Sequence, residues 1–121
     1  MCDYKFIMPW PPSVGSCWRA YRNRFILSAN GRDYRKRAIE HLKSIGLSGE
    51  LIESNVSVSL ILNPPTLRRY DVDNFQKAIL DSFSHAEFWI DDSQVQKITI
   101  TKGEKIKGGN VIVSVNIIAQ T

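Results

Sequence analysis

Apolar residues recur along the chain with two different spacings, and these spacings define its elements. Between residues 56 and 62, valine or leucine occupies every second position, which is the spacing of a strand with one buried face. Asn63-Pro64-Pro65 would end this strand, because proline cannot donate to a ladder. Weaker patterns of the same kind cover residues 4–8, 25–27, 95–101 and 110–118.

Two longer segments have the three- and four-residue spacing of helices that bury one side. The first runs from a cap at Ser28 or Asn30 to about Ile45, where Gly46 would stop it. The second runs from residue 72 or 73 to His85. The predicted apolar stripes consist of Tyr34, Ala38, Leu42 and Ile45 in the first helix and of Phe75, Ala78, Ile79, Ser82 and Phe83 in the second.

The remaining segments indicate connections. The arginine- and aromatic-rich stretch 13–24 predicts irregular structure, and the loop 102–109 joins the last two strands. The chain contains no internal repeat and no low-complexity tract. We therefore expect one α+β domain over residues 1–121. It would be a small mixed β-sheet packed with two main helices, in the order strand, short strand, helix, strand, helix, strand, strand.

The composition indicates a globular protein, and its charge allows a nucleic acid partner without requiring one, since many basic proteins bind none. Hydrophobic residues make up 43% of the chain, which is enough for a core, and the formal net charge of +4 favours a polyanionic partner. Cys2 and Cys17 fit neither a disulfide framework nor a zinc site. The first ten residues do not form a secretion leader, and no apolar run reaches the roughly 20 residues of a membrane span. We expect a cytoplasmic protein with no membrane partner.

Carboxylates gather in two segments. Asp71 and Asp73 precede or open the second helix, and side chains two apart in an extended segment point the same way. Asp91 and Asp92 lie between that helix and the next strand. The short connection 86–91 lets the chain double back beside the start of the helix. We therefore expect Asp92, or Asp91, to meet the first pair around one point.

Clustered carboxylates repel one another unless a cation lies among them. Hard oxygen ligands suit Mg²⁺ or Mn²⁺, and such an ion can polarise a phosphodiester and activate water. Lys77 lies at four-residue spacing between Asp73 and Asp81, on one predicted helical stripe. It would orient the attacking water or stabilise charge in the transition state. Arg68 and Arg69 would steer the DNA backbone toward the metal.

Each of these residues also has a purely structural interpretation. Asp71 and Asp73 suit the N-cap of the second helix, and Asp91-Asp92 suits a turn. Lys77 would then be a helix-face residue paired with its acidic neighbours. Taken together, these interpretations leave the coexistence of both acidic pairs, the lysine and the flanking arginines unexplained.

At these residues the chain resembles the RusA-type Holliday junction resolvases, small endonucleases common in phages and prophages. The resemblance runs almost end to end, from the opening Pro9-Trp10-Pro11-Pro12-Ser13 through Tyr34-Arg35 in the first predicted helix. Its most specific parts are RYDVDNFQKA at 69–78 and FWIDDSQV at 88–95. These two blocks at their spacing are a much stronger signal than a lone pair of aspartates.

This resemblance implies that Asp71, Asp73 and Asp92 bind an essential Mg²⁺ ion, with Mn²⁺ as an alternative, and that Lys77 is catalytic. It also implies a homodimer that nicks four-way DNA junctions symmetrically in DNA recombination and repair. Two sites on a two-fold dimer suit a substrate with two-fold symmetry. The DNA-binding candidates are Arg68 and Arg69 beside the metal site, and Arg19, Arg22 and Arg35 elsewhere.

Other functions fit parts of the same pattern. A nuclease with this metal site would also suit flaps, replication forks or other branched DNA. A catalytically silent protein would bind junctions with a structural acidic cluster, and a basic α+β domain would serve as a protein-interaction module. Trp18 and Tyr21 would either wedge into an open junction centre or pack in the core.

Overall fold

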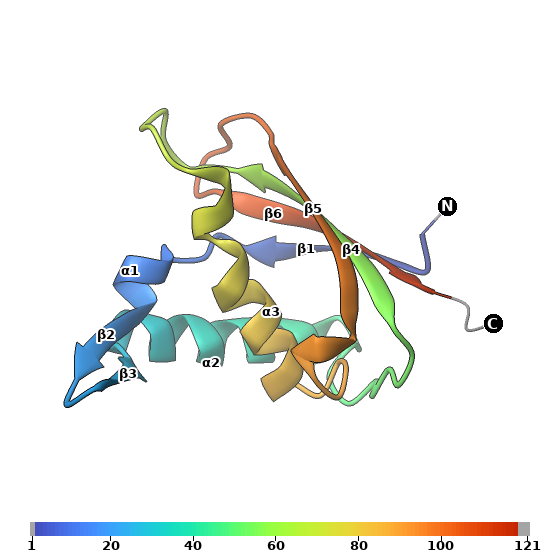
Figure 1. The fold of residues 1–121 in the computed structure, drawn as a ribbon. Coiled ribbons are helices and arrows are strands. Elements are labelled where there is room, and N and C mark those ends of the chain that lie inside the picture. The colour runs from blue at the N-terminus through green and yellow to red at the C-terminus, as the bar shows by residue number, and fades with distance from the viewer. Residues whose placement is uncertain (1, 119–121) are drawn as a thin grey trace.

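The computed structural model describes residues 2–118, which form a four-stranded mixed sheet with helices on one face (Figure 1). The strands are β1 (Tyr4–Pro9), β4 (Val56–Asn63), β5 (Val95–Lys102) and β6 (Asn110–Ile117), in the spatial order β1-β6-β4-β5. Strands β4 and β5 are parallel, and the other neighbouring pairs are antiparallel. The expected α+β class with a small mixed sheet is confirmed.

Strands β5 and β6 are consecutive in the chain but lie on opposite sides of β4. The connection between them crosses the end of β4, where the Gly103 N–H donates to the Leu62 carbonyl at 2.7 Å. Glycine is required there, because a Cβ atom on Gly103 would lie 2.1 Å from Oδ1 of Asn63. This crossover leaves β5 as an edge strand of the sheet.

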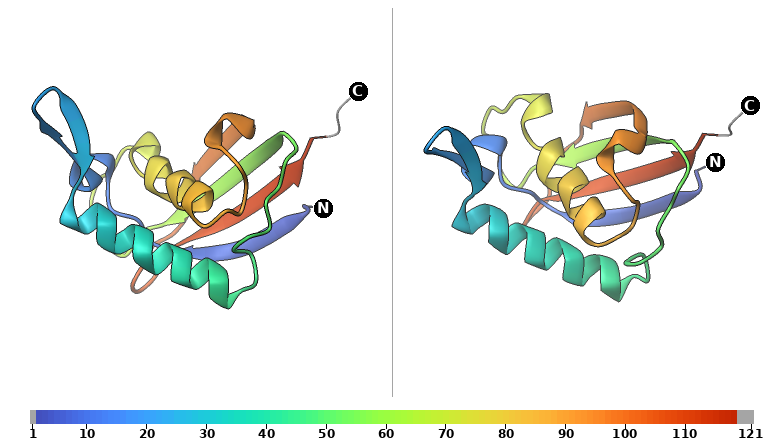
Figure 2. Two further views of the ribbon diagram at one scale, coloured as in Figure 1. Left: turned by 90° about the horizontal axis from the view of Figure 1, so that it is seen from below. Right: turned by 60° about the horizontal axis from the view of Figure 1, so that its bottom comes forward.

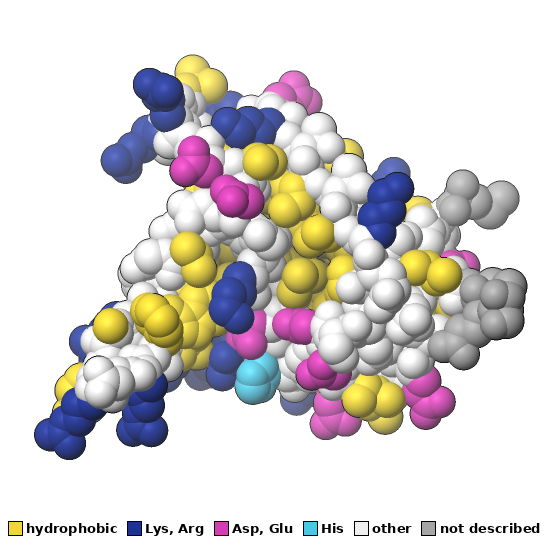
Figure 3. Space-filling model, in the orientation of Figure 1, with side chains coloured by type: hydrophobic (Ala, Val, Ile, Leu, Met, Phe, Trp, Pro, Cys, Tyr) yellow, Lys and Arg dark blue, Asp and Glu magenta, His cyan; other side chains and the backbone are white. Residues whose placement is uncertain are grey.

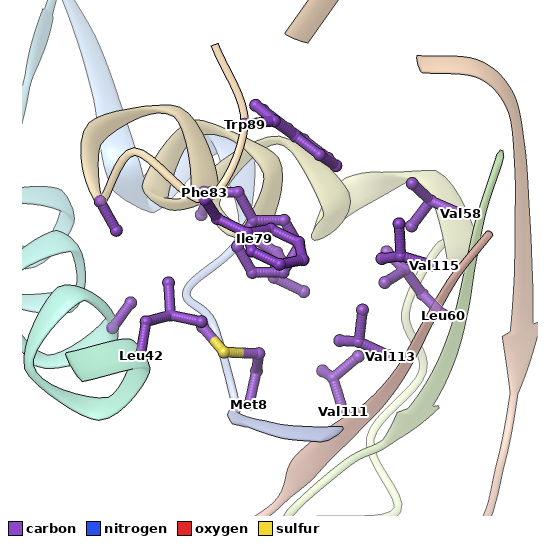
Figure 4. Packing of buried hydrophobic residues seen from close by; sticks show 14 of the residues in the cluster. Met8, Leu42, Val58, Leu60, Ile79, Phe83, Trp89, Val111, Val113 and Val115 are labelled. Atoms are coloured by element: carbon purple, nitrogen blue, oxygen red, sulfur yellow. The ribbon is translucent and has the colours of Figure 1, made fainter. Parts of the chain in front are cut away.

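Alternation along the central strands buries one face of the sheet. Strands β4 and β6 contribute valine and leucine at every second position, and Figure 4 shows these side chains facing Ile79 and Phe83 across the core. Trp89 and Met8 close the cluster at its sides. The buried strand residues are Val56, Val58, Leu60, Leu62, Val111, Val113 and Val115.

Helices α2 (Ala29–Ser44) and α3 (Gln76–His85) cover this face (Figure 2). Helix α2 begins at Ser28, whose side chain accepts a hydrogen bond from a first-turn N–H at 3.1 Å. It ends before Gly46, which has a φ of +79°, as predicted. The predicted apolar stripe of α2 is buried at Tyr34, Ala38 and Leu42, whereas Ile45 follows the helix and is exposed.

Within residues 2–118, no helix is both long and apolar enough to span a bilayer.

The second predicted helix is divided in two. Residues 72–74 form a 3-10 turn, η1 (Val72–Asn74), and Phe75 then departs from helical geometry, with a φ of −124° and a ψ of −15°. The break follows from the burial of the Phe75 ring, which packs against aromatic side chains from two other segments. The prediction of one continuous helix is therefore wrong at its start. Its predicted buried face is confirmed at Phe75, Ala78, Ile79, Ser82 and Phe83.

Residues 14–27 are more regular than the sequence predicts. They form the short helix α1 (Val14–Cys17) and a hairpin of β2 (Trp18–Tyr21) and β3 (Arg24–Leu27). The strand predicted at 25–27 is therefore confirmed, and the irregular structure predicted for 13–24 is wrong. The hairpin projects away from the four-stranded sheet (Figure 1). Because most of its side chains are exposed, the sequence carries no alternation that would reveal β2.

Candidate metal site and DNA interface

The segment between Tyr70 and Phe75 carries the first acidic pair and is held at both ends. The two rings pack on Trp10, with centroids 6.1 and 4.9 Å away, and lie 5.7 Å from each other. Lys102, at the end of β5, donates from Nζ to the Tyr70 carbonyl at 2.7 Å and lies 4.5 Å from the centroid of the Tyr70 ring. The rings of Trp10, Tyr70 and Phe75 thus form an aromatic clamp. Together with Lys102, the clamp holds the acidic segment beside the ends of β1 and β5 and the start of α3.

Asp71 and Asp73 are both exposed on this clamped segment. Asp71 stands at the N-cap of η1 without a side-chain capping bond, and Phe75 rather than Asp73 occupies the N-cap of α3. Among residues 2–118, neither carboxylate has a hydrogen-bond or ion-pair partner. Neither residue caps α3, and the Asp71 side chain makes no capping bond to η1, so both carboxylates are free to bind a cation.

Asp92 lies beside the other end of α3. It opens the 3-10 turn η2 (Asp92–Gln94), which leads directly into β5. Its Oδ1 accepts hydrogen bonds from Oγ of Ser84 at 2.5 Å and from Nε1 of Trp89 at 3.0 Å. Because Trp89 is fully buried, the Asp92 carboxylate has a fixed position next to the last turn of the helix.

Within one chain, Asp92 is not brought to the first acidic pair. The ten residues of α3 separate the two ends, which corresponds to about 15 Å at about 1.5 Å per residue. The prediction that the chain doubles back to the start of the helix is wrong, because residues 86–88 bond to residues 49–52 at its end. Within residues 2–118, no group of three or more His, Cys, Asp or Glu side chains is arranged to hold a metal. Metal binding by Asp92 stays a prediction.

Asp91 has a structural role that its neighbour lacks. Its side chain accepts the Ser93 N–H at 2.9 Å, and the Asp91 N–H donates to Oε1 of Gln94 at 2.8 Å, which completes a capping box. Hydrogen bonds from the Ser93 side chain and backbone hold the pKa of Asp91 below its usual range. The turn interpretation is therefore correct for Asp91, and Asp92 is the better metal-ligand candidate of the two.

Lys77 lies in the first turn of α3, with Nζ 4.8 Å from the centroid of the Trp18 ring. A cation above an indole face is attracted by the ring, so Trp18 steadies the ammonium group. The predicted stripe of Asp73, Lys77 and Asp81 does not form, because Asp73 precedes the helix and Asp81 pairs with Arg35. Lys77 has no carboxylate partner among residues 2–118, which leaves its ammonium available to a phosphate.

Arg35 packs α2 against α3. Its Nε and Nη2 donate to Oδ2 of Asp81 at 3.1 and 2.6 Å, so the guanidinium already has an anionic partner. DNA binding by Arg35 stays a prediction, and its geometry favours a structural role. Arg19 and Arg22 are exposed on the hairpin, where nothing in the described chain neutralises them.

A groove of about 1060 Å³ opens beside Asp71. Its walls include Arg68 and Arg69 from the loop after β4, together with Lys102, whereas Arg37 in the same wall is paired with Asp33 at 2.9 Å. Figure 3 shows basic side chains gathered on two projecting parts of this face, with acidic side chains between them. Positive charge thus lines the approach to the free carboxylates, which is the arrangement that attracts a phosphate backbone.

Two residues of this region were missed by sequence reasoning. Ser84 positions Asp92, but a serine inside a helix pattern carries no signal of that contact. Phe25, on the projecting hairpin, is 77% exposed, and its only sequence signal is an aromatic residue next to arginines at 22 and 24.

The α+β fold presents free aspartates beside an arginine-lined groove, which is an arrangement that suits a phosphate backbone. The chain belongs to the RusA endodeoxyribonuclease family, since the family model described as "Endodeoxyribonuclease RusA" matches residues 9–118. Its relatives include the crossover junction endodeoxyribonucleases RusA of Enterobacteria phage HK97 (34% identical) and of Escherichia coli strain K12 (36% identical). Each alignment spans 111 residues and covers 92% of this chain and 92% of the relative. The resemblance inferred from the sequence is confirmed.

Proposed function

We propose that this protein is a metal-dependent endodeoxyribonuclease that resolves four-way DNA junctions by paired symmetric nicks, in recombination and repair. The observation that carries this proposal is the free Asp71 and Asp73 pair on a clamped segment beside a basic groove. The substrate class is supported by relatives whose names describe crossover junction endodeoxyribonucleases. A phage or prophage origin and a cytoplasmic location stay predictions.

Asp71 and Asp73 fit a Mg²⁺ ion, with Mn²⁺ as an alternative. They offer hard oxygen donors that no group among residues 2–118 engages, and their exposure leaves room for water and phosphate oxygens. Mg²⁺ commonly combines one or two carboxylates with such oxygens, so this pair would supply most of the protein ligands. When bound, the ion supplies polarisation of the phosphodiester and a more acidic bound water.

The neighbouring cations of the chain position the DNA and stabilise charge. Arg68 and Arg69 line the groove next to Asp71 and hold backbone phosphates through charge-assisted hydrogen bonds. Lys77, steadied on the Trp18 ring, either orients the attacking water or stabilises negative charge as the phosphodiester breaks. Both roles require a fixed ammonium group, which the indole provides.

We place Asp92 in the metal site through a second copy of the chain. Strand β5 is an edge strand, with Asp92 before its start and the Asp71 segment beside its end. Two copies paired antiparallel along β5 would bring Asp92 of one next to Asp71 and Asp73 of the other, on one face of a continuous sheet. The pairing would also cover Ile98, which is 38% exposed, and the apolar side chains between α3 and β5 in Figure 3.

Cleavage of matched substrates tests the proposal. A four-way junction, a flap, a fork and a linear duplex of shared sequence are incubated with the protein and Mg²⁺, and all strands are mapped. We expect two symmetric nicks in the junction and no cleavage of the duplex. Preferred cutting of flaps or forks would support the alternative branched substrate. Binding of the junction without any cleavage would instead indicate a silent junction-binding protein.

A further inference from the structure

The β2–β3 hairpin takes no part in the four-stranded sheet. Its strands pair from Trp18 and Leu27 at the base to Tyr21 and Arg24 at the tip, and it stands clear of the sheet in both views of Figure 2. The two turn residues have φ values of +48° and +64°, as in the two-residue turns that match the natural twist of a hairpin. The hairpin is therefore a well-formed projection that is free to contact another molecule.

Phe25 presents a large apolar surface on this projection. Its side chain is 77% exposed, and its cross-strand neighbour is Ala20, whose methyl group is too small to cover the ring. The other exposed aromatic residue of the hairpin, Tyr21, has the Arg22 guanidinium 5.3 Å from its ring centroid. The ring is therefore available to stack on another molecule.

The hairpin that carries Phe25 has only positive charges. Residues 18–27 include Arg19, Arg22 and Arg24 and contain no acidic residue. Arginines without acidic neighbours attract phosphates. In the register of the hairpin, Arg19 and Arg24 lie on the face opposite Phe25 and Arg22 lies in the turn, so phosphates would be held on one face while the ring meets a base on the other. Aromatic rings next to such cations are the combination that binds single-stranded or unpaired nucleotides, because each base has a face on which a ring can stack.

The register of the hairpin relates Phe25 to the candidate catalytic lysine. Phe25 and Trp18 lie on the same face of the hairpin, and Nζ of Lys77 lies over the Trp18 ring. Phe25 is two residues farther out than Trp18, which is about 7 Å at about 3.4 Å per residue. Successive bases of a strand are also about 3.4 Å apart. The Phe25 ring therefore lies about two base steps farther along the hairpin than the Trp18 ring, over which Nζ of Lys77 lies.

We propose that Phe25 stacks on an unpaired base at the branch point of the DNA, while the hairpin arginines hold the adjacent phosphates. This inference rests on the proposed function, because it places the unpaired base next to the strand that is cut. Stacking requires a base that has left its neighbours, which is easier at a branch point than in an intact duplex. Phe25 would therefore determine selectivity for branched over duplex DNA and leave the metal site unchanged.

The test uses four-way junctions that carry 2-aminopurine next to the branch point, since the fluorescence of this base rises when it is unstacked. Binding and fluorescence are measured for the junction and a matched duplex without divalent metal, so that no strand is cut. The variants are Phe25→Ala, Phe25→Trp and Ile45→Ala. Ile45 is the matched control, because it is also exposed and apolar but follows the far end of α2.

We expect the wild type and Ile45→Ala to raise the fluorescence equally, because a phenyl ring quenches this base less than its neighbouring bases do. Phe25→Trp should keep the junction affinity of the wild type but show a smaller rise, because an indole quenches the stacked base. Phe25→Ala should lose the rise and bind the junction about tenfold more weakly, with unchanged duplex affinity, because one base–aromatic stack is removed. Wild-type fluorescence and junction affinity in Phe25→Ala would overturn the inference. A dimer that dissociates on this substitution would also overturn it, since the ring would then contact a second copy.

Cleavage by the wild type separates this inference from the proposed function. The same labelled junctions are incubated with the wild type and Mg²⁺. If the wild type cuts them while Phe25→Ala binds and unstacks them normally, only the role of Phe25 is contradicted. If the wild type neither prefers nor cuts junctions, the proposed function and the stacking role are both contradicted.

Discussion

Asp71 and Asp73 differ from Asp91 and Asp92 in what their carboxylates contact. Asp91 caps a turn, and Asp92 accepts hydrogen bonds from buried or half-buried neighbours. The first two carboxylates have no partner among residues 2–118, so all of their lone pairs are available to a cation. At the scale of single residues, we therefore propose the first pair as the main metal anchor and Asp92 as a further ligand.

Lys77→Ala should slow single-turnover cleavage of a four-way junction by about 10²-fold or more, because a positioned charge next to the scissile phosphate is lost. Junction affinity should change little. Lys36→Ala is the matched control, since Lys36 is an exposed lysine on α2. Equal cleavage rates for the two variants would show that Lys77 is only a surface residue.

Arg69→Ala and Arg35→Ala should have different effects on DNA binding. Arg69 lines the groove, so its loss should reduce the slope of log K against log salt by about one phosphate contact. Arg35 is already paired with Asp81, so its loss should leave that slope unchanged and lower the unfolding free energy by about 1 kcal/mol or less. A reduced slope for Arg35→Ala would show that Arg35 does contact a DNA phosphate.

At the scale of elements, the aromatic clamp keeps the segment of Asp71 and Asp73 outside helix α3. Trp10, Tyr70 and Phe75 come from three places in the chain, and their mutual packing buries Phe75 at the point where the helix pattern would continue. The free carboxylates consequently lie on a short 3-10 turn instead of a helical stripe. The geometry of the site thus depends on tertiary packing.

Phe75→Ala should lower the unfolding free energy by about 3 kcal/mol, because it leaves a cavity beneath this segment. Urea denaturation with unchanged m-value measures the effect. Phe25→Ala is the control, since that ring is 77% exposed and its loss should change stability by less than about 0.5 kcal/mol. Equal loss of unfolding free energy in both variants would contradict the packing of Phe75 in the aromatic clamp.

The sequence predicts the elements with a buried face most clearly and misses strand β2, which has none. The alternation of Val56, Val58 and Leu60 and the spacing of Tyr34, Ala38 and Leu42 are local signals of burial, and both elements are confirmed. Strand β2 has no buried face, so its sequence shows no such signal. The place of β5 beside β4 and the distance of Asp92 from Asp71 depend on long-range pairing, which no local pattern contains.

At the scale of the whole molecule, the two halves of the predicted metal site lie toward opposite ends of β5. Asp92 precedes the start of the strand, and Lys102 at its end contacts the segment of Asp71 and Asp73. In an antiparallel pair of β5 strands, the start of each strand, with Asp92, would lie beside the end of the other, with Asp71 and Asp73. The proposed homodimer would then contain two complete sites, each built from both chains.

A mixture of Asp73→Asn and Asp92→Asn subunits tests this arrangement. Each variant alone should be inactive. In a mixed dimer, one shared site would carry both substitutions and the other would carry neither, so the mixture should regain nicking at one intact site. Metal sites confined to single chains would leave every site with one substitution, and the mixture would stay inactive.

Cleavage of a mobile four-way junction, mapped on all strands with Mg²⁺ or with EDTA, tests the metal-dependent nuclease most directly. The wild type should make paired symmetric nicks with Mg²⁺ and none with EDTA. Asp73→Asn should lose the nicks but keep its junction affinity, because it removes a metal ligand and leaves the basic groove intact. Symmetric nicking in EDTA, or full cleavage by Asp73→Asn, would contradict a metal held by these aspartates.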